Sequence, residues 1–105
     1  MKIRGFQNID LVIVNFYPFE KAINEKKNHS KIIENIDVGG PTMVRAAAKN
    51  FKNVAIVTSN NDYKDLISEL ETLKGKTSLK FRELMSSKAF GLTAYYDAMI
   101  AHWFN

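Results

Sequence analysis

A short glycine-rich segment carries the residues of this sequence that are best suited to chemistry. The segment reads Asp37-Val38-Gly39-Gly40-Pro41-Thr42. Its two glycines let the backbone approach a ligand closely, and free N–H groups at a helix start can receive an anion or an oxyanion. Asp37 could then serve as a general base on a ligand held there. The alternative is that Asp37 only caps the turn and that Gly-Gly-Pro simply interrupts the chain.

Two further clusters place polar groups at the ends of expected elements. Asn15 and Tyr17 stand where the first apolar run ends, and both offer polar tips there. The alternative is a strand that leaves the sheet through a proline turn, with its aromatic residues covering the core. Thr42, Arg45 and Lys49 lie roughly along one face of the next expected helix. Lys49 could turn its ammonium towards developing negative charge, or it could simply face water near the helix C-terminus.

The elements that must position these residues alternate between strand and helix patterns, which predicts an α/β fold. The apolar run Ile9–Phe16 is typical of a strand buried on both faces, and Val54–Thr58 is typical of a second short strand. Pro41 suits the first position of a helix, where its missing N–H costs nothing. The expected helical segments are Glu20–Ile36 with a turn around Asn28–Ser30, Pro41–Asn50, a helix capped by Ser59 or Asn60 that ends at Gly75, and a long region capped by Ser78.

Two strands make a poor sheet, because a stable sheet usually has three or more strands or a covering partner. The first expected strand also starts almost at the N-terminus, with no preceding strand or phosphate-binding turn. We therefore expect a parallel sheet that is flanked by helices and incomplete at the N-terminus. Such a chain is either truncated or completed by another copy of itself.

Composition limits the function classes. The chain has 105 residues, of which 46% are hydrophobic and 25% charged, as in an ordinary soluble domain. The longest apolar run near the start, Leu11–Val14, is too short to cross a bilayer, and no secretion signal precedes it. The chain has no cysteine, which excludes disulfides and thiolate chemistry and is compatible with the cytoplasm, the compartment that we expect.

The net charge of +4 comes largely from scattered lysines. Such lysines are usually a solvated surface, and they indicate an anionic partner only weakly. The sequence has no arginine-rich stripe and no basic-aromatic repeat, so it does not predict nucleic-acid binding.

Several motifs, taken together and in order, resemble one known family. Residues Ile9–Phe19 resemble I-D-L-V-x-V-N-L-Y-P-F, and Ile33–Met43 resemble I-E-N-I-D-I-G-G-P-T-M, which Arg45–Asn50 continues. Residues Lys88–Asp97 resemble K-A-F-x-x-T-A-x-Y-D. These motifs are those of the bifunctional AICAR transformylase and IMP cyclohydrolase family, and they cover nearly the whole chain. The sequence is therefore identified as a fragment of the IMP cyclohydrolase domain of this family.

The resemblance implies a fold similar to that of methylglyoxal synthase and closure of the ring of 5-formamidoimidazole-4-carboxamide ribotide (formyl-AICAR) to give IMP. By resemblance, Asp37 orients or deprotonates the carboxamide, and Lys49 stabilises the oxyanion together with backbone N–H groups near the two glycines. Tyr17 donates or relays a proton, and Asn15 helps to hold the base. The implied catalytic residues are thus Tyr17, Asp37 and Lys49, and the implied substrate-binding residues are Asn15, Val38, Gly39, Gly40, Thr42 and Arg45.

Other features of the family do not occur in this sequence. The family holds phosphate through an N-terminal glycine-rich segment and a K-T-L-H-P motif, and neither is present. The transformylase domain, which uses 10-formyltetrahydrofolate, is also absent. The resemblance thus implies that residues 1–105 form half a site, which faces the base of a purine nucleotide (formyl-AICAR or IMP) and is inactive alone. It also implies a homodimer and a ring-closing step that needs no cofactor. The alternatives are a nucleotide-sensing module and a purely structural or oligomerising one.

Overall fold

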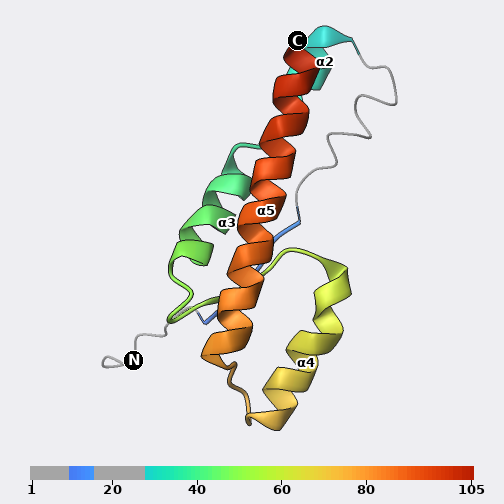
Figure 1. The fold of residues 1–105 in the computed structure, drawn as a ribbon. Helices are drawn as coiled ribbons and strands as arrows, with labels where there is room; N and C mark the ends of the chain where they lie inside the picture. The colour runs from blue at the N-terminus through green and yellow to red at the C-terminus, as the bar shows by residue number, and fades with distance from the viewer. Residues whose placement is uncertain (1–9, 16–27) are drawn as a thin grey trace, which may run out of the picture.

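The computed structural model describes residues 10–15 and 28–105, and these form an α/β arrangement (Figure 1). Its two described strands pair in parallel, with Val12 opposite Ile56. The α/β prediction is therefore confirmed at this level. The elements in chain order are β1 (Leu11–Ile13), α2 (His29–Glu34), α3 (Gly39–Lys49), β2 (Ala55–Val57), the short 3-10 turn η1 (Asn60–Asp62), α4 (Tyr63–Thr72) and α5 (Leu79–Phe104).

Strand β2 forms the centre of the core, and all three of its residues are fully buried. Because side chains alternate along a strand, Ala55 and Val57 face one helix layer and Ile56 faces the other. The first layer adds Leu66 of α4 with Phe81 and Met85 of α5, and the second adds Val44 and Ala48 of α3 with Ala89 of α5. Helix α5 therefore contributes to both layers, and Figure 1 shows it between α3 and α4.

Strand β1 is less buried than the sequence predicts. Leu11 and Ile13 are 37% and 47% exposed, although both belong to an apolar run expected to be buried on both faces. They pair with Ala55 and Val57 and thus face the side of the sheet that α4 covers. Helix α4 packs through Leu66 onto the β2 residues of that face, and this leaves the β1 side chains partly open. The prediction of burial on both faces was therefore wrong for β1, whereas β2, expected only as a second short strand, is buried on both faces.

Two helix starts differ from the prediction. Helix α3 begins at Gly39 and not at Pro41, because the Asp37 carboxylate accepts the Gly40 N–H at 2.9 Å and satisfies a first-turn donor. Helix α2 begins at His29, with the Asn28 side chain accepting the Lys31 N–H at 2.9 Å. The turn expected around residues 28–30 is therefore reduced to a helix cap. The first part of that predicted helical region, residues 20–27, lies outside the described residues.

Three predicted helix boundaries are confirmed. The Ser59 hydroxyl accepts the Asn61 N–H at 3.1 Å and starts the turn η1 that leads into α4. The Ser78 hydroxyl accepts the Phe81 N–H at 3.1 Å at the start of α5. Gly75 follows the end of α4 with a φ of 88°, a conformation that favours glycine. Across the described ranges, none of these helices combines the length and apolar character needed to cross a membrane.

Candidate functional site

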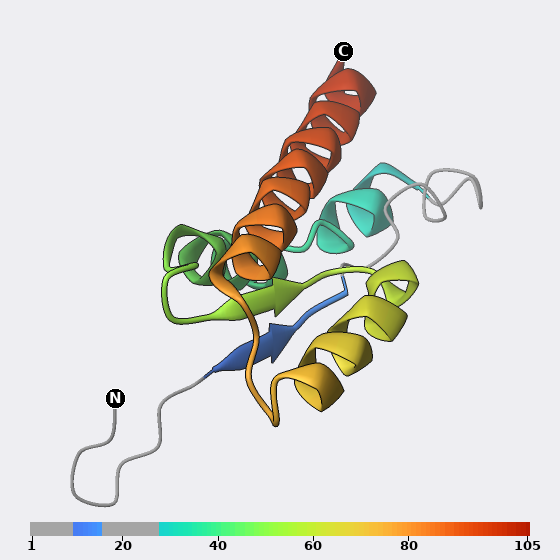
Figure 2. The same cartoon turned by 60° about the horizontal axis from the view of Figure 1, so that its bottom comes forward.

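The turn that precedes α3 lies at the edge of the sheet where the strands end. Helix α3 connects to β2 through a short loop, in which the Val54 N–H donates to the Asn50 carbonyl at 3.0 Å. The end of α3 is thus near the start of β2, and the two elements run in opposite directions, as Figure 2 shows. The first turn of α3 therefore points towards the carboxyl ends of the strands. Open α/β sheets bind their ligands at this edge.

The Asp37 side chain lies directly over the first turn of α3. Its Oδ1 accepts the Gly40 N–H at 2.9 Å. A Cβ atom added at Gly40 would stand 2.6 Å from Asp37 Oδ2, which is closer than van der Waals contact allows. Glycine at position 40 thus gives the carboxylate room to reach the backbone amide. This places a carboxylate and a backbone N–H donor of the first helical turn within one hydrogen bond of each other.

The main chain of Asp37 is held by a residue that is distant in sequence. The Asp37 N–H donates to the Tyr96 hydroxyl oxygen at 2.8 Å. Tyr96 is 3% exposed and packs with Ile32 of α2, in a cluster completed by the half-buried Ile36, Met99, Ile100 and Trp103. The α2–α5 contact thus provides a buried anchor for the turn.

The environment of the Tyr96 phenol favours its neutral form. Burial raises the pKa of Tyr96, the hydrogen bond from the Asp37 backbone lowers it, and the negative charges of Asp37 and Asp97 raise it further. The net direction is upward from the ordinary value of about 10. The phenol is therefore protonated at neutral pH.

The other predicted residues of α3 lie on its exposed face. Thr42, Arg45 and Lys49 are exposed, whereas Val44 and Ala48 are buried. The Thr42 hydroxyl donates to the Val38 carbonyl at 2.8 Å and so reinforces the first turn of the helix. Arg45 lies midway along the helix. Of these residues, Thr42 is the one that the structure brings beside the Asp37 turn.

Lys49 lies at the opposite end of α3 from the Asp37 turn. Helix α3 runs from Gly39 to Lys49, and ten residue steps of about 1.5 Å separate the ends by about 15 Å. Lys49 lines a shallow groove between α3 and α5 with Phe51 and Phe90. Its role at the same reaction centre as Asp37 stays a prediction. Asn15 is exposed just beyond the end of β1, and Tyr17 lies outside the described residues.

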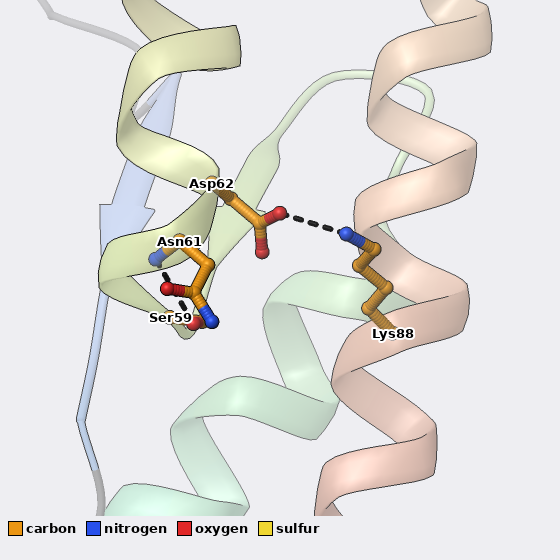
Figure 3. Close-up of polar contacts among 4 residues, drawn as sticks. All are labelled: Ser59, Asn61, Asp62 and Lys88. Atoms are coloured by element: carbon orange, nitrogen blue, oxygen red, sulfur yellow. Dashed lines mark hydrogen bonds and ion pairs between the residues drawn. The ribbon is translucent and has the colours of Figure 1, made fainter.

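Sequence reasoning assigned no site role to two long-range contacts made by α5. One joins Tyr96 to Asp37, and the other joins the Lys88 ammonium to the Asp62 carboxylate at 2.7 Å (Figure 3). Asp62 is 4% exposed, and it follows β2. Both α5 residues lie in the motif Lys88–Asp97. The motif singles out these residues but does not indicate which residues they contact. Over the described ranges, no group of three or more acidic or histidine side chains is placed to hold a metal ion.

Comparison with known proteins shows the family of this chain. A sequence model of the AICARFT/IMPCHase bienzyme family matches residues 47–105, more than half of the chain. The chain belongs to the AICARFT/IMPCHase bienzyme family. This confirms the resemblance found in its motifs, and the relatives of the chain agree with it.

Three relatives each match nearly the whole chain. The bifunctional purine biosynthesis protein PurH of Bradyrhizobium diazoefficiens is 50% identical over 105 residues, which are 100% of this chain and 20% of the relative. The PurH proteins of Rhizobium rhizogenes and Cereibacter sphaeroides are 46% and 47% identical over 99% and 98% of the chain, and over 19% and 20% of their own lengths. The chain thus spans about one fifth of the family members that it matches.

Proposed function

We propose that residues 1–105 form part of the IMP cyclohydrolase domain of a bifunctional enzyme of purine biosynthesis, with a fold like that of methylglyoxal synthase. The motif match, the identity to PurH proteins and the parallel strands flanked by helices support this proposal. The proposed ligand is a purine nucleotide, formyl-AICAR or IMP. The proposed assembly is a cytoplasmic homodimer, and the ring-closing step needs no cofactor.

The contact between the Asp37 carboxylate and the Gly40 N–H carries this proposal. In the ring closure, the carboxamide nitrogen bonds to the formyl carbon and loses a proton, and the formyl oxygen becomes an oxyanion. That oxygen takes up the proton lost by the carboxamide nitrogen and a second proton from the formamide N–H, and it leaves as water while the carbon–nitrogen double bond of IMP forms. The reaction therefore needs a base beside the nitrogen and N–H donors beside the oxygen. Asp37 supplies the base, and the first amides of α3 supply the donors.

The same contact supports a proposal for how a ligand binds. The Gly40 N–H and the Asp37 carboxylate bind each other. The donor and the acceptor that a substrate would use are therefore already paired. Formyl-AICAR carries both matching groups, because its carboxamide N–H can donate to the carboxylate and its formyl oxygen can accept the Gly40 N–H. Binding thus exchanges one hydrogen bond for two and leaves no buried polar group unpaired.

The other predicted residues fit around this centre with different roles. Asn15 and Tyr17 are proposed to hold the base and to relay a proton, and Thr42 and Arg45 to contact the nucleotide from the exposed face of α3. Because Lys49 lies about 15 Å along the helix from Gly39, we assign stabilisation of the oxyanion to the backbone amides.

A calorimetric titration with IMP tests this function on the wild-type chain and on Asp37→Asn, Gly39→Ala and Gly40→Ala. The glycines form a matched pair, because a Cβ at Gly39 meets nothing within 4 Å whereas one at Gly40 meets the Asp37 carboxylate. We expect Gly40→Ala and Asp37→Asn to weaken IMP binding by about tenfold, the value of one charge-assisted hydrogen bond. Gly39→Ala leaves the contact between Asp37 and Gly40 in place and should lose less IMP affinity than Gly40→Ala.

Two results would contradict the proposal. A nucleotide-sensing module would bind IMP equally well with Asp37→Asn, because binding alone needs no general base. A purely structural module would show no saturable heat with any of the four proteins. In either case the Asp37 turn would not be the reaction centre.

A further inference from the structure

We propose that Tyr96 is the positioning residue of this site, because its buried hydroxyl holds the main chain at Asp37 so that the Asp37 carboxylate and the first amides of α3 face one ligand. This inference rests on the function proposed above. It adds a residue from the last helix of the chain, 59 positions after Asp37.

The hydrogen bond to Tyr96 is made at the junction between α2 and α3. After α2 ends, the N–H groups of Asn35 and Ile36 still donate to carbonyls of α2. The next N–H, that of Asp37, donates to Tyr96 at 2.8 Å. The Val38 carbonyl already accepts within α3, from the Thr42 N–H at 3.2 Å. The Asp37–Tyr96 bond thus spans the point at which one helix has finished and the next begins.

Tyr96 is suited to this role because it is itself fixed. It is 3% exposed, and its ring packs against Ile32 and the surrounding apolar side chains of α2 and α5. A buried ring has little rotational freedom, so its hydroxyl stands at a defined place. The preceding residue, Tyr95, is 55% exposed on the same helix. The chain therefore offers a neighbouring tyrosine as a control.

Fixing the main chain at Asp37 restricts where its carboxylate can go. An aspartate has two side-chain torsions, so a carboxylate on a fixed backbone can lie over Gly40 or swing out towards a ligand. If the Tyr96 oxygen is removed, the Asp37 N–H loses its acceptor, and the peptide is free to rotate. Small displacements of a catalytic group carry large costs, because reaction depends on its orientation. We therefore expect the effect of Tyr96 to pass through Asp37.

The experiment compares Tyr96→Phe with Tyr95→Phe in the complete chain. Both remove one hydroxyl, and phenylalanine at position 96 keeps the ring in its cluster. We expect amide hydrogen exchange at Asp37 and Gly40 to become about tenfold faster in Tyr96→Phe, and IMP affinity to fall about three- to tenfold, as for one lost hydrogen bond. Tyr95→Phe should change neither. The thermal midpoint of each variant is measured alongside.

A double-mutant cycle separates positioning from general support of the fold. If Tyr96 acts through Asp37, Tyr96→Phe should reduce IMP affinity much less in the Asp37→Asn background than in the wild type. A residue that merely stabilises the fold would reduce affinity by the same factor in both backgrounds. That additive result would overturn the proposal. Unchanged exchange at Gly40 in Tyr96→Phe would overturn it too.

Failure of the proposed function is distinguishable from failure of this inference. If the wild-type chain does not bind IMP, the proposed function of the chain fails, and amide exchange at Gly40 still decides whether Tyr96 positions the turn. If Tyr96→Phe does not fold, replacing tyrosine by a fluorinated tyrosine weakens the same acceptor without removing it. The Asp37 amide shift should then move, and an unmoved shift would contradict the inference.

Discussion

The two ends of helix α3 are held in different ways. At its first turn, the Asp37 carboxylate and the Gly40 N–H bind each other, and the Asp37 N–H donates to Tyr96 of α5. Beyond its last turn, the Arg82 guanidinium donates to the carbonyls of Phe51 and Lys52 at 2.8 and 3.0 Å. It also donates to the carbonyl and hydroxyl of Thr77.

We propose that this difference separates a functional end of α3 from a structural one. The Arg82 guanidinium ties the segment after α3 to the segment before α5, so this end of α3 is fixed. The Asp37 end contains a pair of groups that a ligand can separate and bind in turn. Lys49 lies at the fixed end, and its catalytic role stays a prediction. Position along one helix therefore distinguishes residues that the motif alone had grouped together.

The largest expected effect tests the structural end. Arg82→Met keeps the apolar stem but leaves three backbone carbonyls without their donor. We expect it to lower the free energy of unfolding by about 2 to 3 kcal/mol, because charged hydrogen bonds are replaced by unsatisfied acceptors. Arg45→Met, on the exposed face of α3, is the control and should cost under about 0.5 kcal/mol. Equal losses in urea unfolding would remove the distinction between the two ends.

A second prediction concerns the ion pair that anchors the segment after β2. Lys88→Met leaves the nearly buried Asp62 carboxylate without its partner and should cost about 1 to 3 kcal/mol. Asp62→Asn should cost less, because the Lys88 side chain is half-exposed and can be solvated. The two values come from urea unfolding at neutral pH. A larger loss for Asp62→Asn would show that the carboxylate does more than pair with Lys88.

A smaller effect sharpens the description of the functional end. Gly40→Ala pushes the Asp37 carboxylate off its amide, whereas Gly39→Ala has open space and gains helix propensity. We expect Gly40→Ala to be less stable than Gly39→Ala by about 1 kcal/mol, the usual value of an N-terminal cap. Thermal unfolding of the two variants, side by side, measures this difference. Equal stability would mean that the carboxylate does not cap α3.

The smallest expected effect is a pH dependence that comes from Tyr96. Because the pKa of Tyr96 is raised in the folded chain, the folded state holds this proton more tightly than the unfolded state. The associated stability is complete below about pH 10 and is lost as the pH rises through the folded pKa. Tyr96→Phe should lack this part of the alkaline loss. Urea unfolding of both proteins between about pH 9 and pH 11, one unit either side of the ordinary tyrosine pKa, measures this effect. The free energies of unfolding of the two proteins should converge as the pH rises, and parallel curves would contradict the prediction.

The elements that sequence reasoning placed well are those with local causes. Ser59 and Ser78 cap helices by accepting N–H groups two or three residues later in the chain. Strand β2 is predicted by its own apolar run. Helix α3 starts two residues before the predicted Pro41, because the Asp37 side chain accepts a first-turn N–H. The exposure of β1 depends on which strand α4 covers, and no pattern within β1 encodes that.

The candidate site divides in the same way. The base and the helix amides were predicted because they lie in one short segment, Asp37–Thr42. No role was predicted for Tyr96, since its partner lies 59 residues earlier in the chain. The distance of Lys49 from Asp37 follows from the observed extent of α3. The motifs therefore predicted the residues of the candidate site, whereas their partners and their positions along α3 depend on long-range contacts and on where the helix ends.

The most direct test of the central claim is an amide NMR titration of the wild-type chain with IMP. It reports both ends of α3 in one experiment. We predict saturable shifts at the amides of Asp37–Thr42 and at the Tyr96 region of α5, with the amides of Phe51, Lys52 and Arg82 unmoved. Saturable shifts confined to the Lys49–Lys52 end, or no response at millimolar IMP from a folded chain, would contradict the account.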